Sequence, residues 1–460
     1  MNESRDFLGT ESIGKLLLKL SLPAVAAQLV NMLYNIVDRI YIGRIPEVGD
    51  LALTGLGVCM PLILIVSAFA ALVSMGGAPR ASIFLGKQQE EEAEKIMGAS
   101  LAFQLLVSAV LTVVLCIWNE DMLLAFGASE NTIGYAAGYM GIYALGTVFV
   151  QVTLGMNAFI SAQGYAKVSM WTVLIGAVCN IVLDPLFIFV FKMGVRGAAL
   201  ATVLSQAVSM LWVLRFLTGE RSRIRLRRKT LRLDLKTILP CVALGLAPFI
   251  MQSTESILSV CFNSSLLKYG GDMAVGAMTI LTSVMQFAML PMQGIAQGAH
   301  TISSYNFGAG NAHRVKQTFW LLVRCTTLYS LVLWALVMLF PGFFAGIFTP
   351  KPELIAFTRW ALRIYCGALC LMGIQIACQM TFISLGNALS SMVVAIMRKF
   401  VLLIPLIYIL PRMFTDKTMA VYLAEPVADV LAVTFTAVLF AFQFRKALRG
   451  MCDSNKAVEE

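Results

Sequence analysis

The sequence predicts an all-α polytopic membrane protein with twelve transmembrane helices in two pseudo-symmetric six-helix lobes around a central cavity. The 460 residues are 59% hydrophobic and 13% charged, with a mean hydropathy of +0.81, which lies outside the range of soluble domains. Apolar runs long enough to cross a bilayer, about 20 residues each, recur along the chain. The two halves of the chain also carry the same residues at matching positions, which predicts the two lobes.

The first half is expected to hold six spans, followed by a basic linker. The first span, residues 20–43, lacks a small-residue cleavage pattern, so we expect it to stay in the protein. Residues 218–239 carry eight Lys or Arg residues and are expected to form a cytoplasmic linker. The alternative for this segment is a polybasic patch that binds lipid or nucleic acid. The other five spans are expected near residues 54–78, 96–117, 133–157, 168–191 and 197–217.

The second half is expected to hold six further spans, near residues 240–262, 274–302, 318–341, 356–380, 393–411 and 420–444. The predicted domains are an N-lobe (1–217), the linker (218–239), a C-lobe (240–446) and a cytoplasmic tail (447–460). Of the 35 Lys and Arg residues, 24 fall in segments expected inside, Arg398 and Lys399 among them, and seven fall in outer loops. This bias predicts that both termini are cytoplasmic.

The internal repeat narrows the possible architectures. A shift of 222 residues places Gly76 on Gly298, and a shift of 225 residues places Pro23 on Pro248. An even number of spans in each half, with both ends inside, means parallel repeats related by an axis along the membrane normal. We therefore expect alternating access by rocking of one lobe against the other.

The first span carries a polar stripe. Asn31, Tyr34, Asn35 and Asp38 are three and four residues apart, so they share one helix face. A carboxylate at membrane depth costs about 2.5 to 3.5 kcal/mol, which a coupling cation would offset. The alternative is that Asp38 lies near the helix end and pairs with Arg39 or meets interfacial water.

The fifth and sixth spans supply the remaining ligands of a predicted cation site. Asn180 and Asp184 are four residues apart, and Pro185 frees a backbone carbonyl one turn earlier. Together with Asp38 and with Thr202 of the sixth span, they form an oxygen set that suits Na⁺ or a shared proton. The alternative is that Asp184 caps the helix or faces the outer loop.

The second half has an intramembrane acid of its own. Glu255 lies in the middle of the seventh span, where it could bind a second cation or a cationic substrate. An equal alternative is a structural pair with Gln286 or Asn263. His300 of the eighth span is expected to be a satisfied structural histidine.

Eight side chains are candidates for the lining of a substrate cavity. The two methionines among them could adapt to several ligand shapes, although packing between helices is the alternative for both. The candidates are Gln28, Asn31, Tyr34, Asn35, Asn157, Gln252, Met285 and Met289.

The motifs of several other classes are missing from the sequence. The ten cysteines form no CxxC and no Cys/His cluster, so neither a disulfide framework nor a zinc site is expected. The absence of a GxxxxGK[ST] loop and of HExxH argues against ATP-driven transport and against an enzyme, and no cofactor is expected. The net charge of +10 is explained by orientation in the membrane, without a nucleic-acid partner.

Five segments resemble the multidrug and toxic compound extrusion (MATE) family, and more closely its Mep-type bacterial subgroup, over essentially the whole chain. The resemblance implies a fold of two six-helix bundles in the bacterial inner membrane. His300 and Thr301 depart from the glutamine and proline expected at those positions. The segments are residues 22–43, 160–164, 180–185, 197–206 and 294–311.

The resemblance also implies a function. Family members export organic cations and amphipathic drugs in exchange for Na⁺ or H⁺, and Asp38, Asn180, Asp184 and Thr202 match their cation-coupling positions in the N-lobe. We expect a monomer whose partners are a small-molecule substrate and the lipid bilayer. A lipid-linked precursor flippase, which should have a more cationic cavity, is the alternative. A channel or receptor would not need paired lobes.

Overall fold

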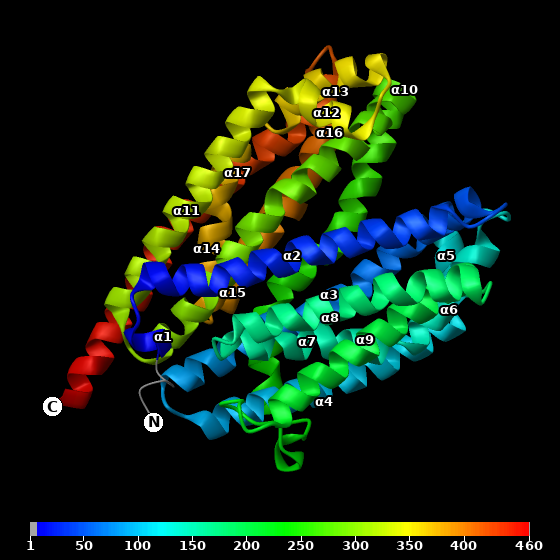
Figure 1. Cartoon of the computed structure of the whole chain (residues 1–460). Helices are drawn as coiled ribbons and strands as arrows, with labels where there is room; N and C mark the ends of the chain where they lie inside the picture. The colour runs from blue at the N-terminus through cyan, green and yellow to red at the C-terminus, as the bar shows by residue number, and fades with distance from the viewer. Residues whose placement is uncertain (1–6, 460) are drawn as a thin grey trace. The chain divides into compact units, whose positions relative to one another are not determined.

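The structure of the protein is a computed structural model that describes residues 7–459, with side chains described as far as Met451 (Figure 1). Every regular element in this part of the chain is helical. The ends of the predicted N-lobe and tail, residues 1–6 and 460, lie outside the described residues.

The helices before and within the linker include one π-helical segment, η1, and one short 3-10 turn, η2. They are α1 (Phe7–Thr10), α2 (Ile13–Gly43), α3 (Gly49–Gly86), α4 (Glu90–Ile117), α5 (Asn119–Ala125), α6 (Ile133–Leu145), α7 (Thr147–Ala162), α8 (Ala166–Pro185), η1 (Leu186–Val190), α9 (Val195–Thr218) and η2 (Arg228–Thr230).

The helices after the linker include a 3-10 turn, η3, and a second π-helical segment, η4. They are α10 (Leu235–Gly308), α11 (Ala312–Leu339), α12 (Pro341–Phe348), α13 (Pro352–Tyr365), η3 (Leu369–Leu371), α14 (Met372–Ser384), α15 (Ala388–Ile396), η4 (Met397–Leu403), α16 (Ile404–Met413) and α17 (Lys417–Glu459).

The helices account for the predicted spans. Within residues 7–459, nine helices are long and apolar enough to cross a membrane, and two bent pairs, α6 with α7 and α13 with Leu369–Ser384, raise the number to eleven. The 74 residues of α10 would measure about 111 Å as one straight helix, far more than the roughly 30 Å of a bilayer core. Its helix is broken at Gly271 (φ 65°, ψ −165°), a conformation open essentially to glycine alone. Counting α10 as two spans gives the expected twelve, and the all-α polytopic fold is confirmed.

The chain divides into two compact units. Unit 1 contains the chain up to Thr10 and Leu22–Gln252, and unit 2 contains Glu11–Ser21 and the chain from Ser253 onward. The helices α2 and α10 therefore each contribute residues to both units. The predicted lobes and their motion stay predictions.

Unit 1 is built around α3. This helix packs against α4, α6 and α7, while α8 packs against α9. Leu56 of α3 lies in a buried apolar cluster with Met140 and Tyr143 of α6. Because the faces turned inward are closely packed, polar groups among them are held in fixed positions.

The basic linker is docked on unit 1. Arg223 donates from Nε to Glu90 Oε1 over 2.7 Å, and the backbone N–H of Arg225 donates to Glu94 Oε1 over 2.9 Å. Asp234 then accepts from the Thr237 hydroxyl at 2.6 Å and from the backbone of the first turn of α10. The Thr237 hydroxyl bond is the main reason that the pKa of Asp234 is lowered.

Gly76 of α3 permits a close helix contact inside unit 1. A Cβ on Gly76 would overlap the carbonyl oxygen of Cys241 in the first segment of α10, whereas a Cβ on Gly57 of the same helix would meet nothing within 4 Å. Alanine favours a helix by about 1 kcal/mol over glycine, but overpacking costs about 1 to 3 kcal/mol.

We therefore expect Gly76→Ala to lower the thermal stability of the purified protein and Gly57→Ala to leave it unchanged or raise it. The midpoint of thermal unfolding in detergent checks both variants. Equal midpoints for the two variants would show that the close contact does not exist.

Unit 2 has its own core and includes the start of α2. The Tyr422 hydroxyl donates to the carbonyl oxygen of Ala274 over 2.7 Å within a buried apolar cluster. Arg314 Nη2 donates to the carbonyl oxygen of Glu11 over 2.6 Å, which fixes the segment before α2. The ammonium of Lys19, 3.2 Å from Glu11 Oε2, is the main reason that the pKa of the Glu11 carboxyl is lowered.

Candidate functional site

Three helices of unit 1 bring the four predicted cation-coupling residues together. Asn180 and Asp184 lie one turn apart on α8, and the Asn180 amide donates to Asp184 Oδ1 over 3.3 Å. The same amide donates to the hydroxyl of Thr202 on α9 over 3.4 Å. The carboxyl of Asp38 on α2 lies close enough to Asp184 for the two groups to interact electrostatically. We call these four residues the unit 1 acid site.

The unit 1 acid site is secluded. Asp184 is fully buried, Asn180 is 2% exposed and Asp38 is 8% exposed. Asp38 does not form the alternative ion pair, since the guanidinium of Arg39 contacts Met60 Sδ at 3.7 Å. Asp184 does not face an outer loop. Two carboxylates at such short range, shielded from water, cannot both keep a charge unless a cation or proton joins them.

Several oxygens at the site have no donor. Asp38 Oδ1, Asn180 Oδ1, Asp184 Oδ2 and the neighbouring Gln206 Oε1 are buried without a hydrogen-bond partner. Unpartnered buried acceptors cost about 1 to 3 kcal/mol each, and hard cations prefer oxygen ligands of this kind. The residues present therefore fit a monovalent cation or a proton as cargo. No group of three or more His, Cys, Asp or Glu in the described chain could hold a metal ion.

The local fold positions Asp184. It is followed by Pro185, which cannot donate a backbone hydrogen bond, and then by the π-helical segment η1. A π turn widens the helix and occurs often at functional sites. The break therefore opens the backbone next to the carboxylate.

The predicted cavity residues of unit 1 differ in exposure and in hydrogen bonding. Asn31 and Asn35 are exposed, but the Asn35 amide donates to the carbonyl oxygen of Asn31 over 2.7 Å. Gln28 and Tyr34 are partly exposed. Asn157 is turned toward α8, where its amide donates to the carbonyl oxygen of Ser169 over 3.3 Å.

The other cavity candidates lie elsewhere. Gln252 is partly exposed and ends the α10 portion assigned to unit 1. Met285 and Met289 pack against the apolar core of unit 2, and Met285 Sδ is 3.8 Å from Cys366 Sγ. These contacts correspond to the packing alternative for both methionines.

Glu255 has a partner that the sequence did not suggest. Its Oε1 lies 2.8 Å from Lys399 Nζ, and neither Gln286 nor Asn263 bonds to it in the described chain. The lysine side chain is 6% exposed, whereas the glutamate side chain is 57% exposed. The buried amine therefore depends on the carboxylate more than the reverse.

A buried ion-pair cluster in unit 2 was missed by the sequence analysis. Arg398 donates from Nε to Asp429 Oδ1 over 2.9 Å, and its Nη2 lies 3.4 Å from Glu425 Oε1. All three side chains are at most 10% exposed. With Lys399 and Glu255 they form what we call the unit 2 charge cluster, which carries three acids and two bases.

The placement of Arg398 and Lys399 corrects the sequence analysis. Both were counted as cytoplasmic loop residues, but they lie buried in η4 between α15 and α16. Removing these two from the inner count of 24 leaves 22 against seven, so the charge bias persists. The sequence did contain a signal for this cluster. Glu425 and Asp429 lie four residues apart in an apolar run, and two acids at membrane depth predict a buried base as their partner.

Two smaller expectations have mixed outcomes. His300 Nε2 is buried without a hydrogen-bond partner, so this histidine is not satisfied as expected. The nine cysteines among the described side chains are free, as expected. Cys452 lies outside them.

The MatE family model matches residues 23–186 and 248–409, which together make up more than half of the chain. The chain belongs to the MATE family. The two matches begin at Pro23 and Pro248, the pair that the 225-residue shift aligns, so the family model detects the same repeat. The predicted relationship to MATE transporters is confirmed.

Curated relatives of this MATE protein are export proteins. It is 23% identical to the multidrug export protein MepA of Staphylococcus haemolyticus (strain JCSC1435) over 434 residues, which cover 94% of this chain and 95% of the relative. It is 22% identical to MepA of Staphylococcus aureus (strain NCTC 8325) over 427 residues, 92% of this chain and 94% of the relative. Both relatives are named as multidrug export proteins.

Solved MATE structures share its fold. A MATE transporter in the bent conformation superimposes with a TM-score of 0.91 at 21% identity, covering 98% of this chain and 99% of the other. A transporter of the same superfamily from Pyrococcus furiosus, described as having a binding pocket of reverse polarity, gives 0.89 at 22% identity, with 97% and 98% covered. These comparisons show that the chain has the fold of solved MATE transporters.

Proposed function

We propose that this MATE protein is a secondary active antiporter that exports organic cations and amphipathic drugs in exchange for Na⁺ or H⁺. The observation that carries the proposal is the pair of adjacent carboxyls, Asp38 and Asp184, with buried oxygens that lack donors. A cation or proton at this position relieves both the charge repulsion and the missing bonds. The polar neighbours Asn180 and Thr202 complete the ligand set.

Coupling requires that the ion and the drug favour different states of the protein. The ion stabilises the state in which the carboxyls are neutralised, and the drug stabilises the state in which they are free. Differential affinity of the two states then drives alternating access. The proposal needs no further cofactor, and the protein acts as a monomer in the bacterial inner membrane with both termini in the cytoplasm.

The charges of the unit 1 acid site and the unit 2 charge cluster support cationic cargo over the alternative. A flippase for lipid-linked precursors is expected to have a predominantly cationic cavity. Here the two bases of the unit 2 charge cluster are paired with three acids, and the unit 1 acid site adds two more carboxyls. Acids therefore outnumber bases in both of these sites.

Efflux measurements test the proposal. An inward Na⁺ gradient and an inward H⁺ gradient are imposed on proteoliposomes in separate experiments. We expect at least one of them to drive export of ethidium against its own gradient, with saturable kinetics. Liposomes with no gradient are the control. Ethidium flux that is indifferent to both gradients, or that does not saturate, would contradict antiport and favour a channel.

A further inference from the structure

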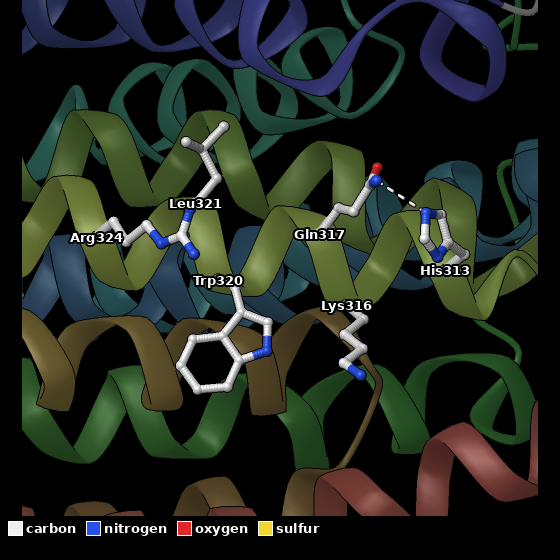
Figure 2. A pocket seen from close by; sticks show the side chains of 6 residues that line it. All are labelled: His313, Lys316, Gln317, Trp320, Leu321 and Arg324. Carbon is white, nitrogen blue, oxygen red and sulfur yellow. Dashed lines mark hydrogen bonds between the residues drawn. The ribbon is translucent and has the colours of Figure 1, made fainter.

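One face of α11 carries basic and aromatic side chains around a shallow hollow of about 310 Å³ in unit 2 (Figure 2). At 100° per residue the lining side chains fall within one side of the helix. We call this surface the α11 basic face. It consists of His313, Lys316, Gln317, Trp320, Leu321 and Arg324.

The α11 basic face has no negative charge of its own. Lys316 and Arg324 are exposed, and neither takes part in an ion pair within the described chain. Gln317 Nε2 lies 2.8 Å from His313 Nε2, so these two side chains bond to each other (Figure 2). The two free cations therefore attract an anion from outside the chain.

The position along the span identifies the source of that anion. The 28 residues of α11 measure about 42 Å, whereas the bilayer core is about 30 Å thick, so roughly 12 Å of the helix lies in the headgroup region. The sequence places that excess at the N-terminal end, since the apolar run begins near residue 318. Trp320, 50% exposed, then lies at the boundary, where tryptophan is enriched.

Arg324 lies one turn deeper than Trp320. An exposed, unpaired guanidinium at that depth is unfavourable unless its long side chain reaches back to an anionic headgroup. Lys316, two turns earlier on the same face, stands in the headgroup region. A phosphate between the two would pair with both cations, and arginine can bind it through two parallel hydrogen bonds.

We propose that the α11 basic face is a binding site for the phosphate headgroup of an anionic phospholipid. Arg324 and Lys316 pair with the phosphate, and Trp320 contacts the glycerol and the first acyl carbons. Zwitterionic phospholipids bind less well because their own cationic group neutralises the phosphate. The site is separate from the unit 1 acid site and does not depend on the proposed antiport.

Quenching of tryptophan fluorescence tests the site. The protein is placed in phosphatidylcholine nanodiscs that contain a fixed fraction of brominated phosphatidylglycerol or of brominated phosphatidylcholine. Subtracting the signal of Trp320→Phe isolates Trp320. We expect brominated phosphatidylglycerol to quench Trp320 more strongly than brominated phosphatidylcholine does. Equal quenching by the two lipids would overturn the proposal, and this comparison uses the protein with its basic residues unchanged.

Charge variants and free phosphate complete the test. In Lys316→Gln/Arg324→Gln the preference for the anionic lipid should fall by roughly fivefold for each cation removed. The matched control Lys351→Gln/Arg412→Gln, which removes two other exposed cations of unit 2, should keep the preference. Loss of preference in the control alone would refute the site. Relief of quenching by inorganic phosphate would identify free phosphate as the ligand and overturn the lipid proposal.

Discussion

Asp38→Asn is expected to leave the protein folded and inserted but to impair its export against a gradient severely. The amide has nearly the shape of the carboxylate, but it can neither release a proton nor supply a negative charge beside Asp184. Losing one charged interaction of about 1.5 to 3 kcal/mol should lower gradient-driven ethidium efflux by on the order of tenfold to a hundredfold. Efflux from proteoliposomes under the better of the two imposed gradients is the measurement.

Asp50→Asn is the matched control for that variant. Asp50 is an exposed carboxylate in the first turn of α3, so the same chemical change there removes a solvated charge. Its efflux should equal that of the unchanged protein. If the rate of gradient-driven ethidium efflux is the same for Asp38→Asn and Asp50→Asn, the assignment of the unit 1 acid site to ion coupling is wrong.

Arg398→Met is expected to be the most destabilising single change in unit 2. It leaves Asp429 and Glu425 buried without their cation, and breaking a buried ion pair from one side costs about 3 to 5 kcal/mol. The midpoint of thermal unfolding should fall well below that of Arg412→Met, an exposed arginine in the same unit.

A compensated variant separates loss of charge balance from loss of packing. In Arg398→Met/Glu425→Gln/Asp429→Asn the three charges disappear together, so much of the lost stability should return. A triple variant less stable than Arg398→Met would show that the guanidinium acts through its packing. A single variant as stable as Arg412→Met would show that the cluster is not formed.

The fold could be predicted from the sequence because the bilayer restricts the possible structures. Apolar runs, basic loops and a repeat suffice to place helices when every spanning backbone group must bond internally. The breaks within spans could not be located in this way. The 57° bend between α6 and α7 lies inside one apolar run, so the hydropathy of the sequence does not reveal its position.

The two sites differ in how far the sequence could predict them. Asn180 and Asp184 share a helix face and follow a recognisable pattern, so their proximity to Thr202 was predictable. The cluster of Arg398 with Asp429 was not, because a basic pair near a span end is ordinarily a loop signal. Only the three-dimensional packing of η4 against α17 shows that these charges belong together.

The two π-helical segments constrain chain length as well as chemistry. η1 follows Asp184, and η4 holds Arg398 and Lys399. Deleting one residue from either segment would turn its wide π turn into an ordinary α-helical turn, and the residues within the segment would change the direction in which they point. In η4 such a deletion would carry a base away from its acids. Among homologues, substitutions in these segments should therefore be far more common than insertions or deletions.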